Sequence, residues 1–180
     1  GYILKFDIRK FFDSINHQVL KQKLHCFPDE EVQKLLSHIV DSYAKEPETE
    51  EPSQRGLPLG NQTSQWFALW YLNGLDRLIK EKFGIKYYSR YMDDGILIHE
   101  NKTYLKQCLE EMTAYVEKEL KLSFNEKTQI FPISQGADYL GFRFYLTDTG
   151  KVIRRLRTSN KKRWKRRLKL YQKQYRQGTK

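Results

Sequence analysis

Two adjacent carboxylates within a strand-like stretch constrain the fold of this chain most strongly. Asp93 and Asp94 stand in RYMDDGILIH (90–99), between an aromatic run and an aliphatic run. The β-forming residues on both sides and the Asp-Asp-Gly turn predict a hairpin with the acids near its tip. Like charges this close repel, which raises the pKa of a carboxyl group unless a cation lies between them. The pair is therefore either a solvated turn or a metal site.

The pattern around this hairpin predicts an α+β fold. Residues 2–8 read as a buried strand that ends in Asp7, and apolar spacing predicts helices over 29–44, 61–83 and 102–121. Residues 45–56 are polar and broken by proline, which indicates an exposed loop. This order of elements fits a split βαβ layout on a ferredoxin-like antiparallel sheet packed with helices. In such a sheet the first strand lies beside the central hairpin, so Asp7 is expected to face the hairpin tip.

Composition narrows the class of protein. The chain has 180 residues, of which 39% are hydrophobic, which suits a folded domain with its own core. It contains no stretch long enough to span a membrane and no signal-peptide pattern. Cys26 and Cys108 make neither a disulfide framework nor a zinc site, so a cytoplasmic location is expected. Gly1 leads directly into an apolar strand, as expected of a segment from a larger polypeptide.

Positive charge is concentrated at one end of the chain. The net charge is +11, and residues 151–180 hold 14 of the 33 Lys and Arg residues and none of the acids. The first 150 residues hold the other 19 basic residues and all 22 acidic residues. This distribution indicates a polyanionic partner such as nucleic acid, with a solubilising charged face as the alternative.

Three acids contributed by two strands have the chemistry of a magnesium site. Mg²⁺ prefers oxygen ligands and completes its shell with water and substrate phosphate. Two such ions about 3.5–4 Å apart stabilise the attacking and leaving oxygens of a phosphoryl displacement. Convergence of Asp7 with Asp93 would therefore explain why the chain keeps unneutralised carboxylates together.

Five motifs occur in an order that resembles the palm of reverse transcriptases: FDIRKFFDSI, RGLPLGNQTSQ, YMDD, LSFNEKT and YLGFRF. Together they span residues 1–145. The resemblance implies a polymerase palm over 1–157 and the start of a basic, helical thumb over 158–180. It also implies fingers before Gly1 and most of the thumb after Lys180, so the isolated chain is expected to have weak or no activity.

The resemblance assigns the catalytic roles. Asp7 and Asp93 would bind two Mg²⁺ ions, or Mn²⁺, with Asp94 as an accessory ligand and the Ile8 carbonyl completing the shell. Lys127, in LSFNEKT, would protonate the pyrophosphate leaving group; the alternative is a solvated surface lysine.

The resemblance also assigns nucleotide and nucleic-acid contacts. Phe12 would exclude the ribose 2′-hydroxyl and favour a DNA product, unless it is simply a core residue. Pro58, Gly60 and Gln65 would contact the incoming deoxynucleoside triphosphate. The residues expected to contact the RNA template or the DNA primer are Arg55, Tyr91, Met92, Leu140, Gly141, Arg163, Lys165 and Arg166.

The implied function is RNA-directed DNA synthesis by a bacterial retroelement enzyme. Leu59-Gly60 and Ser64-Gln65 depart from the commonest bacterial pattern and are similar to diversity-generating retroelement enzymes. A group II intron-type reverse transcriptase or maturase is the first alternative. A catalytically inactive nucleic-acid-binding module is the second, and the intact acids disfavour it. A nucleotide cyclase is disfavoured by Phe12, the basic tail and the YLGFRF hairpin.

Overall fold

The computed structural model describes residues 1–43, 54–58 and 60–178. It divides into two compact units, residues 1–130 and 131–180, and each is described by itself. The polar loop expected over 45–56 falls mostly outside the described residues. The α+β fold expected from the sequence is confirmed.

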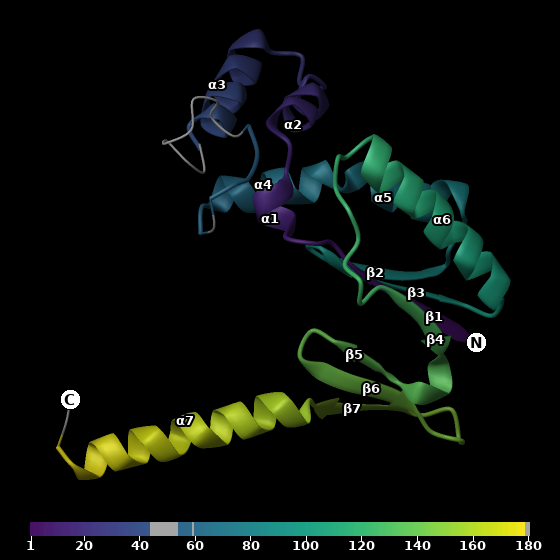
Figure 1. Cartoon of the computed structure of the whole chain (residues 1–180), viewed down its shortest axis with the longest axis vertical. Helices are drawn as coiled ribbons and strands as arrows, with labels where there is room; N and C mark the ends of the chain where they lie inside the picture. Colours follow the sequence, from purple (N-terminus) through teal and green to yellow (C-terminus); the bar gives the residue numbers. More distant parts are fainter. Residues whose placement is uncertain (44–53, 59, 179–180) are drawn as a thin grey trace. The chain divides into compact units, whose positions relative to one another are not determined.

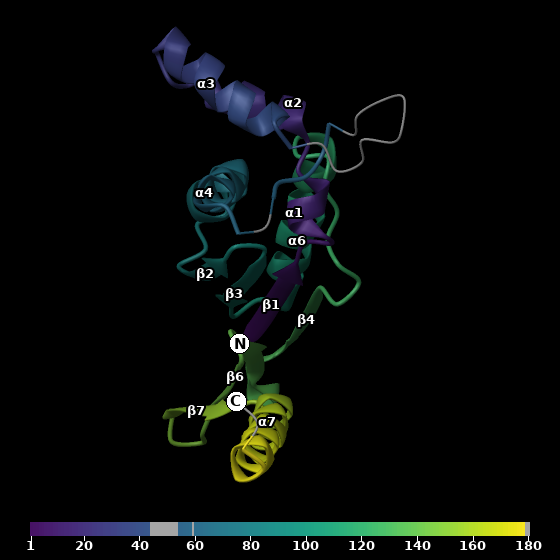
Figure 2. The same cartoon turned by 90° about the vertical axis from the view of Figure 1, so that its left-hand side faces the viewer.

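A four-stranded antiparallel sheet organises the first unit. Its strand order is β2-β3-β1-β4, which is the ferredoxin-like order expected from the sequence (Figure 2). The strands are β1 (Tyr2–Asp7), β2 (Tyr87–Tyr91), β3 (Asp94–His99) and β4 (Gln129–Pro132). The hairpin formed by β2 and β3 turns at Met92 and Asp93, so the carboxylates lie at its tip as expected.

Alternation along β1 separates a core face from a polar face. Leu4, Phe6 and Ile8 are almost completely buried in the hydrophobic core, whereas Lys5 and Asp7 are half-buried on the opposite face. Gly95 of β3 lies directly across from Phe6. A Cβ atom at Gly95 would lie 2.2 Å from the Phe6 ring, so the ring occupies the space that a side chain would need.

Helices cover the core face of this sheet. α5 and α6 lie along the same side of the sheet, and α2 and α3 pack against each other (Figure 1). Asn16, Asp29 and Asn101 cap α2, α3 and α6 through side-chain oxygens that accept backbone N–H groups. The helices are α1 (Phe11–Ser14), α2 (His17–Leu24), α3 (Glu30–Asp41), α4 (Gln62–Tyr71), α5 (Asn73–Arg77) and α6 (Lys102–Lys118).

The prediction of a single helix over 61–83 was wrong. α4 ends at Tyr71, α5 follows, and a π-helical segment η1 (Leu78–Lys82) completes the stretch before Gly84. Gly74 explains why α5 packs closely, because a Cβ there would lie 2.0 Å from the Tyr115 hydroxyl of α6. Leu69 and Trp70 of α4 are exposed, so the apolar residues of this stretch do not form one continuous buried face.

The second unit contains a three-stranded sheet and one long helix. The second and third strands form a hairpin in which Leu146 pairs with Val152. α7 has no buried side chain among its described residues. The elements are η2 (Ile133–Gln135), β5 (Ala137–Tyr139), β6 (Phe142–Leu146), β7 (Val152–Leu156) and α7 (Thr158–Arg176). None of the described helices combines the length and apolar character needed to cross a membrane.

Candidate active site

The three acids meet at one end of the first sheet. Asp7, the last residue of β1, lies directly across from Asp94, the first residue of β3. Side chains of directly paired residues point to the same face of an antiparallel sheet. Asp93 precedes Asp94 in the turn, and its backbone carbonyl accepts a hydrogen bond from the Ile8 N–H at 3.3 Å. Residues 86 positions apart in the chain therefore share one small region.

Burial and mutual repulsion make this region electrostatically unfavourable for three bare carboxylates. Burial raises the pKa of Asp93, and the negative charges of Asp7 and Asp94 act in the same direction. Burial also raises the pKa of Asp94, although its interaction with Lys5 opposes that change. A cation bound between the acids would relieve this repulsion.

Lys5 holds Asp94 from the neighbouring strand. Its ammonium nitrogen lies 3.5 Å from Asp94 Oδ1, and both side chains are only about a quarter exposed, at 24% and 27%. Lys5 precedes Asp7 by two residues, so the two side chains share the polar face of β1. Asp94 is thus partly neutralised by a fixed lysine, which distinguishes it from Asp93.

A buried polar network holds the turn formed by Met92 and Asp93, which we call the carboxylate turn. Met92 adopts a left-handed backbone conformation, with φ of 53°, and its carbonyl accepts a hydrogen bond from Arg90 Nη1 at 2.6 Å. Arg90 also donates to both carboxylate oxygens of Asp76 in α5, one of them at 2.7 Å from Nε. The Tyr88 hydroxyl donates to the same Asp76 at 2.7 Å. The Arg90 side chain is only 8% exposed, so helix α5 fixes the turn through Arg90.

The donor chemistry of this site fits a hard divalent cation. Asp7 and Asp93 supply the carboxylate oxygens that Mg²⁺ prefers, and their charges already interact. Across residues 1–43, 54–58 and 60–178, no group of three or more His, Cys, Asp or Glu side chains is arranged closely enough to hold a metal ion. A cation held by these acids would take its remaining ligands from water and phosphate oxygens.

Phe12 and the loop before α4 lie next to one another. The Phe12 carbonyl accepts the Leu57 N–H at 2.8 Å, and the Phe12 ring is half-buried against the core. Its edge-on contact with Phe11, at 5.6 Å between ring centroids, orients it. Phe12 therefore packs on the core while part of its side chain remains exposed to solvent.

The segment that leads into α4 is open for contacts. Gly60 is exposed with a φ of 101°, and α4 begins two residues later without a side-chain cap. Gln65 is exposed on α4, and Pro58 is half-buried. Leu59 lies outside the described residues. Uncapped N–H groups at a helix start favour anionic ligands.

The loop that carries Lys127 is hydrogen-bonded to β1, the strand that ends in Asp7. The Asn125 N–H donates to the Asp7 carbonyl at 2.7 Å, and the Asn125 side chain accepts the Lys127 N–H at 3.1 Å. Lys127 itself is exposed. The backbone thus positions Lys127 two residues from the point where this loop contacts Asp7.

The remaining predicted contact residues divide between the two units. In the first unit, Tyr91 is 61% exposed beside Asp94, Met92 is half-buried and Arg55 is exposed. In the second unit, Leu140 and Gly141 form the turn between β5 and β6, both with positive φ, as a type I′ hairpin requires. Arg163, Lys165 and Arg166 are exposed on α7.

Sequence reasoning missed Lys5 and the network formed by Arg90, Asp76 and Tyr88. Lys5 was detectable, because strand alternation places it on the same face as Asp7. The contact between Asp76 and Arg90 joins a helix to a strand and had no local sequence signal.

Comparison with protein-family models decides the family. The model described as "Reverse transcriptase (RNA-dependent DNA polymerase)" matches residues 1–144, which include all three acids and the turns at Met92–Asp93 and Leu140–Gly141. The chain belongs to the reverse transcriptase family. No curated protein matches the chain.

Solved structures show the same fold as this reverse transcriptase chain. An apo telomerase from Candida tropicalis, truncated from its C-terminal domain, aligns with a TM-score of 0.65 and 19% identity, covering 86% of this chain and 35% of that one. Telomerase from the same organism with a TWJ fragment of telomeric RNA aligns at 0.63 and 17%, covering 84% and 29%. A Candida albicans telomerase complex with such a fragment gives 0.58 and 16%, covering 85% and 31%. The chain thus spans about a third of the length of these structures and shares their palm fold.

Proposed function

We propose that this chain is the palm-centred part of an RNA-directed DNA polymerase of a bacterial retroelement, most similar to the diversity-generating retroelement enzymes. The observation that carries the proposal is the meeting of Asp7 with Asp93 and Asp94 at one sheet end in a reverse transcriptase fold. The reaction is attack of a primer 3′-hydroxyl on the α-phosphate of a deoxynucleoside triphosphate, with pyrophosphate as the leaving group.

Asp7, Asp93 and the Ile8 carbonyl are proposed to hold two Mg²⁺ ions, for which Mn²⁺ could substitute. When bound, these ions would stabilise charge on the attacking and leaving oxygens. Asp94 is proposed as an accessory ligand because Lys5 already neutralises part of its charge. Lys127 would donate a proton to pyrophosphate or stabilise it by charge alone, and the bond from Asn125 to the Asp7 carbonyl keeps its loop near the acids.

The nucleotide pocket is proposed to use Phe12 together with Pro58, Gly60 and Gln65. Phe12 is half-buried, so its ring has limited freedom to move away from a sugar 2′-hydroxyl. Gly60 has no side chain, which permits close approach of backbone to the base or phosphate.

The nucleic-acid surface is proposed to use one group of residues from each unit. Arg55, Tyr91 and Met92 belong to the palm, and the turn at Leu140 and Gly141 would contact the primer end. Residues 158–180 would begin the thumb, where Arg163, Lys165 and Arg166 contact phosphates without reading sequence. The likeness to telomerase structures that contain a telomeric RNA fragment supports an RNA template.

Primer extension tests the proposed function. We expect the full-length protein that contains this chain to extend a DNA primer on an RNA template in the presence of Mg²⁺ and deoxynucleotides. The isolated chain should extend it weakly or not at all. Extension that occurs only on DNA templates would contradict the proposal. So would the absence of extension by the full-length protein with either Mg²⁺ or Mn²⁺.

Phe12→Ala should relax the selection against ribonucleotides. Removing the ring opens space for a 2′-hydroxyl, so we expect the preference for deoxynucleotides to fall by about tenfold or more, because a steric exclusion of 1–3 kcal/mol is lost. The measurement is the ratio of kcat/KM values for the two sugars in the full-length protein. Phe27→Ala, the same change at an exposed ring that contacts Trp70 and not Phe12, should leave that ratio unchanged. An unaltered ratio in Phe12→Ala would identify Phe12 as a core residue only.

A further inference from the structure

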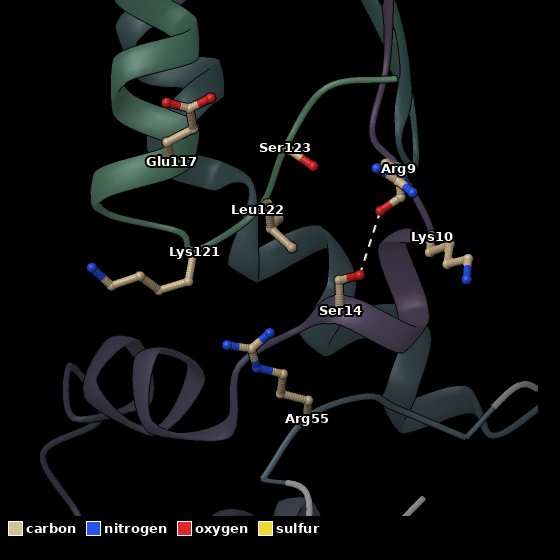
Figure 3. Close-up of a pocket in the computed structure, with 8 residues that line it drawn as sticks. All are labelled: Arg9, Lys10, Ser14, Arg55, Glu117, Lys121, Leu122 and Ser123. Atoms are coloured by element: carbon tan, nitrogen blue, oxygen red, sulfur yellow. Dashed lines mark hydrogen bonds between the residues drawn. The ribbon is translucent and has the colours of Figure 1, made fainter. Parts of the chain in front are cut away.

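A pocket of about 560 Å³ in the first unit is lined in part by the residues that follow β1 in the chain (Figure 3). Its side chains come from three segments: the turn after β1 together with α1, the end of α6 with its following loop, and the loop at Arg55. We call it the basic pocket, defined by its cationic and hydroxyl side chains: Arg9, Lys10, Ser14, Arg55, Lys121 and Ser123.

Charge in the basic pocket is strongly one-sided. Among the lining residues that the structure describes, four side chains are cationic and Glu117 is the one acid. Within the part of the chain that the structure describes, no ion pair neutralises Arg9, Lys10, Arg55 or Lys121. The pocket therefore concentrates positive charge beside a sheet end that concentrates negative charge.

The backbone that presents these cations is held by hydrogen bonds. The Arg9 N–H donates to the Ser123 carbonyl at 2.9 Å, which joins the turn after β1 to the loop after α6. The Gly56 N–H donates to the Ile15 carbonyl at 2.8 Å, and the buried His17 ring is bonded to the Gly56 carbonyl at 2.7 Å. The segments are thus fixed before any ligand arrives, which reduces the ordering required for binding.

We propose that the basic pocket binds free inorganic pyrophosphate. Pyrophosphate is small enough for the cavity, and its several negative oxygens can accept charge-assisted hydrogen bonds from guanidinium, ammonium and hydroxyl groups together. Arg9 follows Asp7 by two residues, so the pocket begins beside the acids at which pyrophosphate would be released. The assignment of pyrophosphate as the biological ligand rests on the proposed function; the presence of an anion site does not.

Calorimetric titration of inorganic pyrophosphate into the chain tests the proposal. EDTA in the buffer removes metal-mediated binding, and the ionic strength is kept constant because exposed charges are screened by salt. We expect saturable binding at one site. The double variant Arg55→Gln, Lys121→Gln should weaken it by about tenfold or more, since two charge-assisted contacts are lost. Glu117→Gln should strengthen it, because a repulsive carboxylate is removed.

A matched double variant controls for net charge. Arg77→Gln, Lys34→Gln removes one arginine and one lysine that are exposed away from the pocket, and it should change affinity by less than about twofold. Equal weakening by both double variants, or no saturable binding to the unaltered chain, would overturn the proposal. Circular dichroism of all variants verifies that these surface changes leave the fold intact.

Competition distinguishes pyrophosphate from other phosphate sources. A single-stranded oligonucleotide that displaces pyrophosphate through Arg55 and Lys121 would reassign the pocket to the nucleic-acid backbone. A deoxynucleoside triphosphate that binds more tightly through the same two residues would reassign it to the incoming nucleotide. Asp93→Asn should bind pyrophosphate as the unaltered chain does, so the pocket can stand if polymerase activity fails, and polymerase activity can stand if the pocket fails.

Discussion

Asp93→Asn is expected to lower the rate of primer extension by about a thousandfold or more in the full-length protein. The substitution keeps the shape of the side chain but removes the charge that faces Asp7, and with it much of the affinity for the catalytic cation. Metal ions contribute several kcal/mol of transition-state stabilisation in such reactions, which corresponds to about this factor. Single-turnover primer extension measures the loss, and binding of RNA–DNA hybrid should be nearly unchanged.

The same variant has a readout in the isolated chain. Mn²⁺ bound to the chain, followed by electron paramagnetic resonance, should be lost or strongly weakened in Asp93→Asn. Asp148→Asn, which makes the same chemical change at an exposed turn of the second unit, serves as the matched control and should retain binding. Retained activity and retained Mn²⁺ binding in Asp93→Asn would show that the metal assignment is wrong.

Arg90→Met is expected to lower the free energy of unfolding by about 3 kcal/mol. The substitution leaves the Asp76 carboxylate without its buried partner, and breaking a buried ion pair from one side typically costs this much. It also removes the donor that holds the Met92 carbonyl, so the carboxylate turn loses its anchor. Urea unfolding of the chain measures the first effect, and Mn²⁺ affinity measures the second.

Two further variants separate the buried network from a general charge effect. Arg90→Met with Asp76→Leu should regain part of the lost stability, because no buried charge is then left unpaired. Lys82→Met breaks the exposed pair with Glu111 and should cost no more than about 1 kcal/mol. If Arg90→Met were no more destabilising than Lys82→Met, Arg90 would not anchor the turn.

Local patterns in the sequence were sufficient for the strands and most helix boundaries. The apolar run that ends in Asp7 predicted β1, the Asp-Asp-Gly turn predicted the hairpin of β2 and β3, and apolar spacing predicted the starts of α3 and α6 to within one residue. These features depend on neighbours within a few residues, where backbone geometry and side-chain period are set locally. The stretch from 61 to 83 failed for the opposite reason, since the close contact of Gly74 with Tyr115 is made across two helices.

For the candidate site, the sequence alone predicted which acids form it and determined which family the motifs resemble, because both depend on residue types and their order. Only the tertiary structure decided how those acids differ. Strand pairing sets Asp94 beside Lys5, and helix α5 holds the adjoining turn through Asp76 and Arg90. The tertiary structure also places Arg9, Arg55 and Lys121 around one cavity. Such contacts join segments far apart in the chain, and their energies depend on burial and distance, which a linear sequence does not specify.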